Sequence, residues 1–185
     1  MVVSLNKPNN SISKLLGVQI SCELTNVTNL SPSCDNFRWY LKVKCGNCGE
    51  NTHDYVYINS VEKTPIQDSR GDANLVIRCK FCKRVSNADI IPGSILPYSL
   101  DDSGHFKTIA KFDCRGLEFT EFSPRCGWSA SSVNSDAVFD DISLTDEIWC
   151  DYDEKGIHLP IPDTYFLYLS VYVAHATIQE TDLYR

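Results

Sequence analysis

The chain has 185 residues and a formal charge of -7, with 43% hydrophobic and 22% charged residues. This balance is ordinary for a folded globular protein and excludes a largely disordered chain. The sequence contains no run of about 18 apolar residues, which excludes a membrane-spanning helix.

Residues 1–20 lack the basic start, the apolar stretch and the small-residue cleavage site of a secretory signal. We therefore expect a soluble protein of the cytoplasm, with the nucleus as an alternative location. The nine cysteines are then thiols or metal ligands, because a reducing compartment disfavours disulfides and an odd number cannot all pair.

Short apolar and β-branched segments recur between turn residues, and several of them alternate as half-buried strands do. In chain order, we predict a helical turn at Ser11–Leu16, strands at Val18–Ile20, Phe37–Val43, Tyr55–Ile58, Leu75–Ile77 and Thr108–Phe112, a helical turn at Ser129–Val138, and strands at Asp140–Leu144 and Tyr165–Val173. Tyr165–Val173 is the clearest strand because it is dense in aromatic and β-branched residues. The predicted class is all-β, with mainly antiparallel sheets.

A weak internal repeat lies under this pattern. Ile20–Pro32 aligns without a gap to Phe112–Pro124, and the alignment pairs Cys22 with Cys114. Repeats of this kind indicate a duplicated architecture. We therefore predict two related β lobes with a pseudo-two-fold axis, at residues 1–92 and 93–185, with one continuous domain as the alternative. The first half carries 11 Lys and Arg against 8 Asp and Glu, and the second carries 6 against 16.

Two C-x-x-C pairs follow predicted strands in the first lobe. The first pair is Cys45 and Cys48, and the second is Cys79 and Cys82. Two residues between cysteines let a tight turn direct both sulfurs to one ion, and two such turns supply a tetrahedral site. We predict one structural Zn²⁺ per chain. Iron in an all-sulfur site is the alternative that the sequence leaves open.

The residues around these pairs support the metal interpretation. Gly46 and Gly49 can adopt positive φ and let the backbone curl around the sulfurs. Six cations beside the ligands are expected to offset the thiolate charge and to hydrogen-bond the sulfurs: Lys42, Lys44, Arg78, Lys80, Lys83 and Arg84. Since four cysteines fill the coordination sphere, metal-assisted hydrolysis is not expected.

The remaining cysteines and the histidines show no ligand spacing. We interpret the five other cysteines as buried thiols: Cys22, Cys34, Cys114, Cys126 and Cys150. The four histidines lack partner motifs. Ile148–Lys155 is similar to Ile77–Arg84, with Cys150 in the place of Cys79 and Asp153 in the place of Cys82. We interpret this likeness as a decayed, metal-free site in the second lobe.

Four segments together resemble the eukaryotic CXXC-motif-containing zinc-binding protein family, long catalogued as a domain of unknown function. They are FRWYLKVKCGNCGE (37–50), VIRCKFCKR (76–84), FKTIAKFDCRGLEF (106–119) and DYDEK (151–155). The resemblance spans nearly the whole chain. It implies a mainly β fold of two related halves, with one zinc held by Cys45, Cys48, Cys79 and Cys82. It implies no reaction.

The sequence is consistent with several functional hypotheses. The first is a monomeric protein-protein interaction module without catalytic activity. The second is a nucleic-acid binder that stacks bases on Phe37, Trp39, Tyr40 and Phe81, but a net charge of -7 disfavours phosphate binding. An enzyme is not expected, because no Ser-His-Asp set or phosphate-binding glycine loop is found. A metal-handling protein that donates zinc is the last alternative.

Overall fold

The computed structural model describes residues 13–67, 69–146, 148–152 and 168–180. These residues form fourteen strands and a single 3₁₀ turn, η1 (Leu100–Asp102), and contain no α-helix, so the predicted all-β class is confirmed. The strands are β1 (Ser13–Thr25), β2 (Val27–Pro32), β3 (Trp39–Cys45), β4 (Val56–Ile58), β5 (Thr64–Pro65), β6 (Asp72–Ala73), β7 (Leu75–Arg78), β8 (Val85–Ile90), β9 (Lys107–Arg115), β10 (Leu117–Ser123), β11 (Trp128–Ser132), β12 (Val138–Ile142), β13 (Ile148–Tyr152) and β14 (Tyr168–Glu180).

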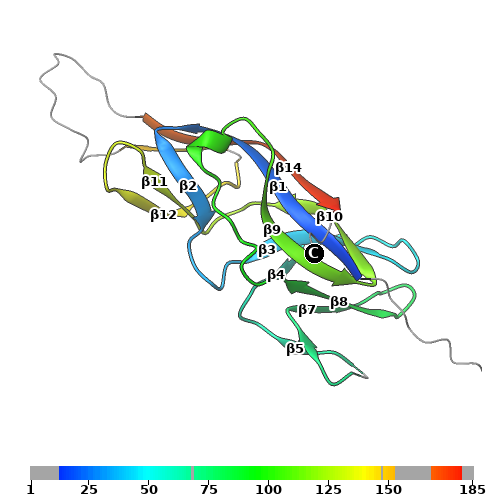
Figure 1. Cartoon of the computed structure of the whole chain (residues 1–185). Coiled ribbons are helices and arrows are strands. Elements are labelled where there is room, and N and C mark those ends of the chain that lie inside the picture. Colours follow the sequence, from blue (N-terminus) through cyan, green and yellow to red (C-terminus); the bar gives the residue numbers. More distant parts are fainter. Residues whose placement is uncertain (1–12, 68, 147, 153–167, 181–185) are drawn as a thin grey trace, which may run out of the picture.

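The largest sheet has six antiparallel strands in the order β13-β14-β1-β9-β8-β7. Its two longest strands, β1 and β14, run side by side along the elongated molecule (Figure 1). Val18, Ile20 and Cys22 on β1 are fully or almost fully buried. Because alternate side chains of a strand point to one face, these residues direct one face of the sheet into the core.

Two three-stranded antiparallel sheets pack with the large sheet, in the orders β10-β3-β4 and β12-β11-β2. On β3 the residues Trp39, Leu41 and Val43 are buried, while the side chains between them reach the surface. This period of two is the pattern of a strand with one buried face. The first of these sheets positions the first C-x-x-C pair, because β3 ends at Cys45.

Aromatic rings from different sheets meet in the core. The ring of Trp39 on β3 lies 5.9 Å from Phe112 on β9, 5.7 Å from Phe122 on β10 and 6.0 Å from Trp128 on β11, measured between centroids. Trp39 and Trp128 are almost fully buried. The pairs with Phe112 and Trp128 are edge-to-face, and such pairs stabilise by about 0.5 to 1.5 kcal/mol each beyond their buried area. The cluster therefore joins the three larger sheets into one core.

The two predicted helical turns are wrong where the structure describes them. Residues 13–16 belong to β1, and residues 129–132 belong to β11, which pairs with β2 and β12. Along β11 the buried residues Ala130 and Ser132 alternate with half-buried ones. Cross-strand pairing has outweighed the weak local preference of a Ser- and Ala-rich segment. Residues 11 and 12, and residues 165–167 of the predicted last strand, lie outside the described ranges.

The internal duplication is not confirmed. Both aligned segments form two strands joined by a single residue with positive φ, Asn26 between β1 and β2 and Gly116 between β9 and β10. The sequence alignment, however, pairs Asn26 with Glu118 and not with Gly116. Each of the three larger sheets also combines strands from both sides of residue 92. This arrangement favours one continuous domain, and the division into lobes stays a prediction.

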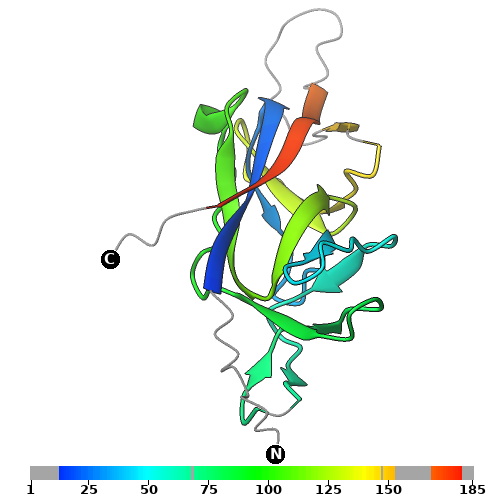
Figure 2. The same cartoon turned by 90° about the vertical axis from the view of Figure 1, so that its right-hand side faces the viewer.

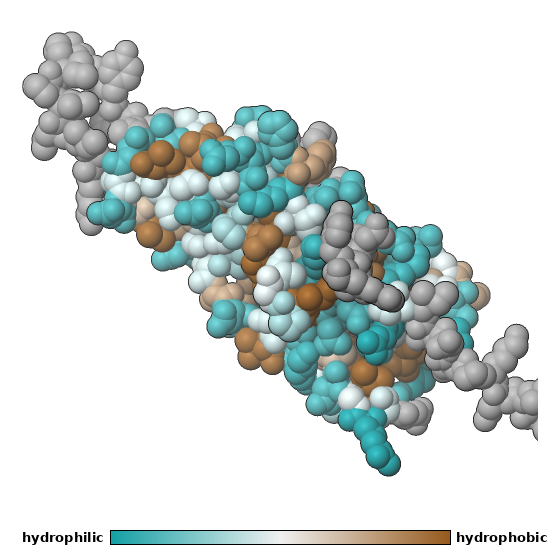
Figure 3. Space-filling view, in the orientation of Figure 1, coloured by the Kyte–Doolittle hydropathy of each residue, from teal (hydrophilic) through white to brown (hydrophobic). Residues whose placement is uncertain are grey.

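The surface mixes polar and apolar residues. On the face seen in Figure 3, hydrophobic residues form small separate patches among hydrophilic ones. Among the residues that the structure describes, no helix has the length and apolar character needed to cross a bilayer.

Candidate metal centre

The first C-x-x-C pair forms a tight turn at the end of β3. The backbone N–H of Gly49 donates to the carbonyl of Cys45 at 2.9 Å, and the N–H of Cys45 donates to the carbonyl of Glu50 at 2.8 Å. Gly49 has a φ of 78°, which a residue without Cβ adopts at little cost. These bonds place the sulfurs of Cys45 and Cys48 on the same side of the turn.

The second pair repeats this geometry after β7. The backbone N–H of Lys83 donates to the carbonyl of Cys79 at 3.0 Å, and the N–H of Cys79 donates to the carbonyl of Arg84 at 2.9 Å. Lys83 has a φ of 62° at the position that corresponds to Gly49. The two turns are therefore equivalent in their hydrogen bonds and in the left-handed residue that follows the second cysteine.

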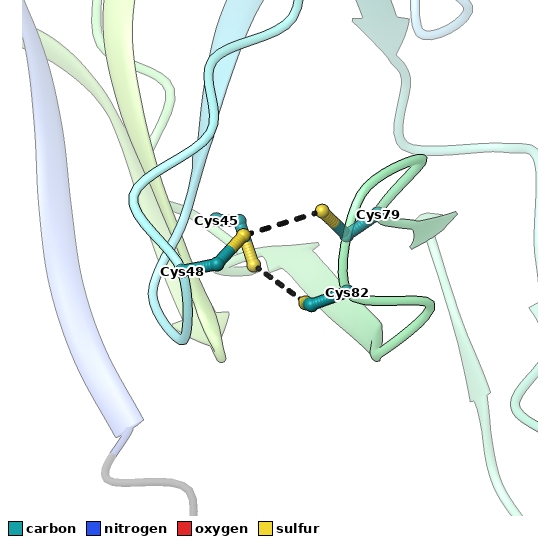
Figure 4. Close-up of side chains that lie close together, drawn as sticks. All are labelled: Cys45, Cys48, Cys79 and Cys82. Carbon is teal, nitrogen blue, oxygen red and sulfur yellow. Dashed lines mark hydrogen bonds between the residues drawn. The ribbon is translucent and has the colours of Figure 1, made fainter.

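The four sulfurs face one another across the two turns (Figure 4). The Sγ atoms of Cys45 and Cys82 lie 3.7 Å apart, those of Cys48 and Cys79 lie 3.6 Å apart, and all four lie within 4.8 Å of one another. A tetrahedron with metal-sulfur bonds of about 2.3 Å has sulfurs about 3.8 Å apart. The cluster thus fits a tetrahedral ion, and the structure brings together all four residues that the sequence singled out.

Backbone N–H groups support the two second cysteines. The backbone N–H of Arg84 donates a hydrogen bond to the sulfur of Cys82, and its effect on the pKa of this thiol is larger than the opposite effect of burial. Together with the side-chain amide of Asn47, it lowers this pKa to about 6. The N–H of Glu50 acts on Cys48 in the same sense, but burial and the neighbouring thiols together raise the pKa of Cys48 to about 12. Thiols this close cannot all ionise without a cation, which favours a bound metal ion.

Asn47 connects the two turns, a role that no pattern in the sequence indicates. Its Oδ1 accepts a hydrogen bond of 2.6 Å from Nη1 of Arg84, while its amide donates to the sulfur of Cys82. Among the expected cations, Lys42 pairs instead with Glu121, and Lys83 donates to a backbone carbonyl. Direct hydrogen bonds from these two lysines to the sulfurs are therefore not formed. Backbone N–H groups of Glu50 and Arg84 donate to the sulfurs instead.

Gly46 is required for a different reason from the predicted one. Positive φ values occur at Gly49 but not at Gly46. A Cβ at Gly46 would instead lie 3.1 Å from the backbone of Gly116, whose carbonyl accepts hydrogen bonds from the Gly46 N–H at 3.0 Å and from Ser86 Oγ at 2.8 Å. The close approach fixes the first turn against the joint between β9 and β10.

The two turns belong to different sheets but lie side by side. The loop after β3 extends the β10-β3-β4 sheet, and the loop after β7 extends the edge of the six-stranded sheet. Both loops project to the same side of the molecule in Figure 2. A cavity of about 250 Å³ opens beside them, with Val43, Val56, Ile77 and Leu117 among its lining residues.

The other cysteines only partly follow the prediction of buried thiols. Cys22 and Cys114 are buried, and burial raises the pKa of both, to about 12 for Cys22. Cys34, Cys126 and Cys150 are exposed, so the prediction is wrong for these three. The sequence offered no signal for this difference, because exposure depends on which strand ends and loops they occupy.

The hypothesis of a decayed second metal site is wrong at Cys150. This residue lies inside the edge strand β13, opposite Ser170 of β14, and not in a turn after a strand. It is also at the opposite edge of the six-stranded sheet from β7 and the second C-x-x-C turn. Asp153 lies outside the described residues.

Two of the four residues proposed for base stacking are buried, and a third, Tyr40, has the guanidinium of Arg125 over its ring. Phe37 and Trp39 belong to the aromatic core, with exposures of 5% and 1%. Phe81, in contrast, is 76% exposed between the two cysteines of the second turn. The stacking surface predicted for a nucleic acid therefore does not exist as a unit.

His53 is exposed and lines the cavity, but it is not part of the four-residue cluster. His105 directs Nδ1 towards the carbonyl of Ser103 at 3.0 Å. His158 lies outside the described residues. Neither of the first two forms a metal-ligating group within the described part of the chain.

Comparisons with known proteins agree with this geometry. A family model described as "CXXC motif containing zinc binding protein, eukaryotic" matches residues 17–161. The chain is 47% identical over 141 residues to UPF0587 protein v1g245604 of Nematostella vectensis, which covers 76% of this chain and 88% of that protein. It is 44% identical to the CXXC motif containing zinc binding protein of Homo sapiens, over 76% and 88% of the two chains.

Solved structures show the same fold. The crystal structure of C1orf123 matches with a TM-score of 0.78 and 38% identity, over 90% of this chain and 98% of that chain. A hypothetical protein from Plasmodium falciparum matches with a TM-score of 0.74 and 22% identity, over 91% and 99%.

Proposed function

Because the chain belongs to the eukaryotic family of CXXC motif containing zinc binding proteins, we propose that its four clustered cysteines hold one structural Zn²⁺ ion. We propose further that the protein is a non-catalytic module that binds other proteins in the cytoplasm. The single observation behind the structural role is the filled coordination sphere. Four protein sulfurs at tetrahedral spacing leave no position for a substrate or a water molecule.

A metal ion here would join two turns between which the described residues form no direct backbone hydrogen bond. Cys45 and Cys48 extend a three-stranded sheet, while Cys79 and Cys82 extend the edge of the six-stranded sheet. An ion bound by all four sulfurs would hold the two loops together. This geometry supports a role in shaping the surface around the two turns.

That surface has features of a protein contact site. The ring of Phe81 is 76% exposed at the second turn, and the mainly apolar cavity of about 250 Å³ opens beside the metal centre. Exposed aromatic side chains next to an apolar hollow are typical anchors at protein interfaces. The exposed thiols of Cys34 and Cys126 further support a reducing compartment as the place of action.

Metal analysis and partner capture test this proposal together. We expect one zinc per purified chain, and no iron. The tagged full-length protein should retain specific cytosolic proteins, and it should lose them after chelation or in the Phe81→Ala variant. Phe106→Ala, which removes another exposed aromatic ring that does not line the cavity, is the matched control. Iron in the site, or partners that are unaffected by both chelation and Phe81→Ala, would contradict the proposal.

One observation favours a metal-handling protein as the second candidate. Cys48 is exposed, and Cys79 and Cys82 are only half-buried, so a competing thiol can reach part of the ligand set. Ligand exchange through exposed thiolates is the chemistry that metal transfer needs. Measured zinc release to a chelating dye separates the two roles. Release within seconds would favour transfer, whereas release over hours would favour a structural ion.

A further inference from the structure

The outer face of the β10-β3-β4 sheet carries cations and tyrosines. Alternation along β3 buries Trp39 and Leu41 and turns the neighbouring side chains outward. Together with residues before and on β4 and after β10, they form a set that we name the cation–tyrosine face: Arg38, Tyr40, Lys42, Tyr55, Tyr57 and Arg125. All six side chains are exposed or half-buried.

The cations of this face lie over the tyrosine rings. Cζ of Arg125 is 4.0 Å from the ring centroid of Tyr40 and 5.3 Å from that of Tyr55. Cζ of Arg38 is 4.6 Å from the centroid of Tyr57. These are cation–π distances, and a guanidinium fixed on a ring loses little further freedom when it binds a ligand.

Two carboxylates lie beside this face, and neither forms an ion pair with the two arginines. Glu62 accepts a hydrogen bond of 3.2 Å from the hydroxyl of Tyr57 and attracts Arg38 electrostatically. Lys42 pairs with Glu121 at 2.8 Å, and this carboxylate also accepts from the hydroxyl of Tyr55 at 3.0 Å. Neither Arg38 nor Arg125 forms an ion pair within the described residues. Three cations against these two carboxylates leave the face locally positive on a chain of net charge -7. Such a local field attracts a ligand of opposite charge.

The backbone at Arg125 adds a second, independent observation. Its φ is 37°, in the left-handed region that favours glycine, and its carbonyl accepts a hydrogen bond of 2.7 Å from the N–H of Leu144. A large side chain in this conformation is strained, and such strain is concentrated at functional positions. The strained backbone holds the guanidinium over two tyrosines.

We propose that the cation–tyrosine face binds an acidic segment of a partner protein, through carboxylates that pair with Arg38 and Arg125. This proposal rests on the protein-binding function proposed above and names the surface and the chemistry of the partner. A guanidinium stacked on a ring keeps its N–H edge open for a carboxylate. Nucleic acid fits less well, because the cations cover the tyrosine rings on which bases would stack.

Fluorescence anisotropy with the full-length protein tests this proposal. The probe is a fluorescein-labelled peptide in which Glu and Ala alternate, and a Gln-Ala peptide and an oligouridine RNA of the same length serve as comparisons. The Glu-Ala peptide should bind most tightly, and binding should weaken with added salt. The double variant Arg38→Gln and Arg125→Gln should weaken it by about fivefold or more, as two lost exposed ion pairs would.

Arg70→Gln combined with Arg115→Gln is the matched control, because it removes the same two positive charges from exposed positions outside this face. Equal binding by the control and the double variant, or tighter binding of the RNA than of the peptide, would overturn the proposal. Partner capture by the double variant separates the two proposals. If cytosolic partners are retained unchanged while the acidic peptide fails to bind, the protein-binding function stands and the assignment of this face falls.

Discussion

Replacing the exposed ligand Cys48 by serine tests the structural role of the metal centre. The ion would close a loop of 37 positions between Cys45 and Cys82. The chain-entropy relation for a cross-link of this length gives a stabilisation of about 4 kcal/mol. For a protein of this size, this corresponds to a fall in melting temperature of about 8 to 16 °C. We expect Cys48→Ser to lose metal and to melt lower by this amount.

The matched control is Cys34→Ser, because Cys34 is also exposed and lies outside the cluster. Thermal unfolding should be measured for each protein with and without a chelator, alongside its zinc content. The chelator should lower the melting temperature of the wild type and of Cys34→Ser to a similar extent, and should change that of Cys48→Ser much less. If the chelator destabilises Cys48→Ser as strongly as the wild type, the metal is not bound by this cluster.

Three further changes probe the site and the fold. Asn47→Ala should weaken zinc binding about 10- to 100-fold in a competition titration, because it removes a donor to a ligating sulfur; unchanged affinity would refute that role. Tyr98→Phe should cost about 1 to 3 kcal/mol in denaturant unfolding, since the buried hydroxyl accepts from the N–H of Cys22 at 3.2 Å. Although burial alone would raise the pKa of Asp102, its hydrogen bond from Lys107 and further donors lower it to about 2. Its stabilising contribution is therefore full above about pH 4 and is lost as the pH falls towards 2, and Asp102→Asn should flatten this part of a melting-temperature profile.

The metal centre was the part of the molecule most accessible from the sequence. Two C-x-x-C pairs identify their ligands by the spacing of residues within each pair, and this spacing does not depend on how the rest of the chain folds. The supporting donors could not be predicted in the same way. Asn47 reaches Cys82 only because two distant loops meet, and the sequence shows neither the meeting nor the direction of a side chain. Lys83 likewise takes a left-handed conformation where a glycine would have been the expected signal.

The strand predictions succeeded where alternation was strong and failed where it was weak. β3 alternates buried and outward residues over its whole length, and the predicted strand Phe37–Val43 overlaps it with both bounds two residues early. The segment around Ser129 is rich in small residues, and it becomes a strand only because β2 and β12 pair with it on either side. Sheet order depends on pairings between residues far apart in the chain. Such pairings leave little trace in a single sequence, so the interleaving of the two halves could not be foreseen.

The metal centre and the cation–tyrosine face share one strand, but we expect them to act independently. β3 is paired with β10 from Tyr40 to Cys45, and with β4 from Trp39 to Leu41, so its outer face is held by two neighbours without any metal. Loss of the ion frees the loops beyond Cys45, not the paired strand. Chelation should therefore abolish contacts made at Phe81, while the affinity for the acidic peptide stays within about twofold, well short of the loss of about fivefold expected when both arginines are removed. Anisotropy titrations before and after chelation measure this directly. A large loss of peptide affinity on chelation would show that the metal also orders the sheet, and that the two surfaces form one site.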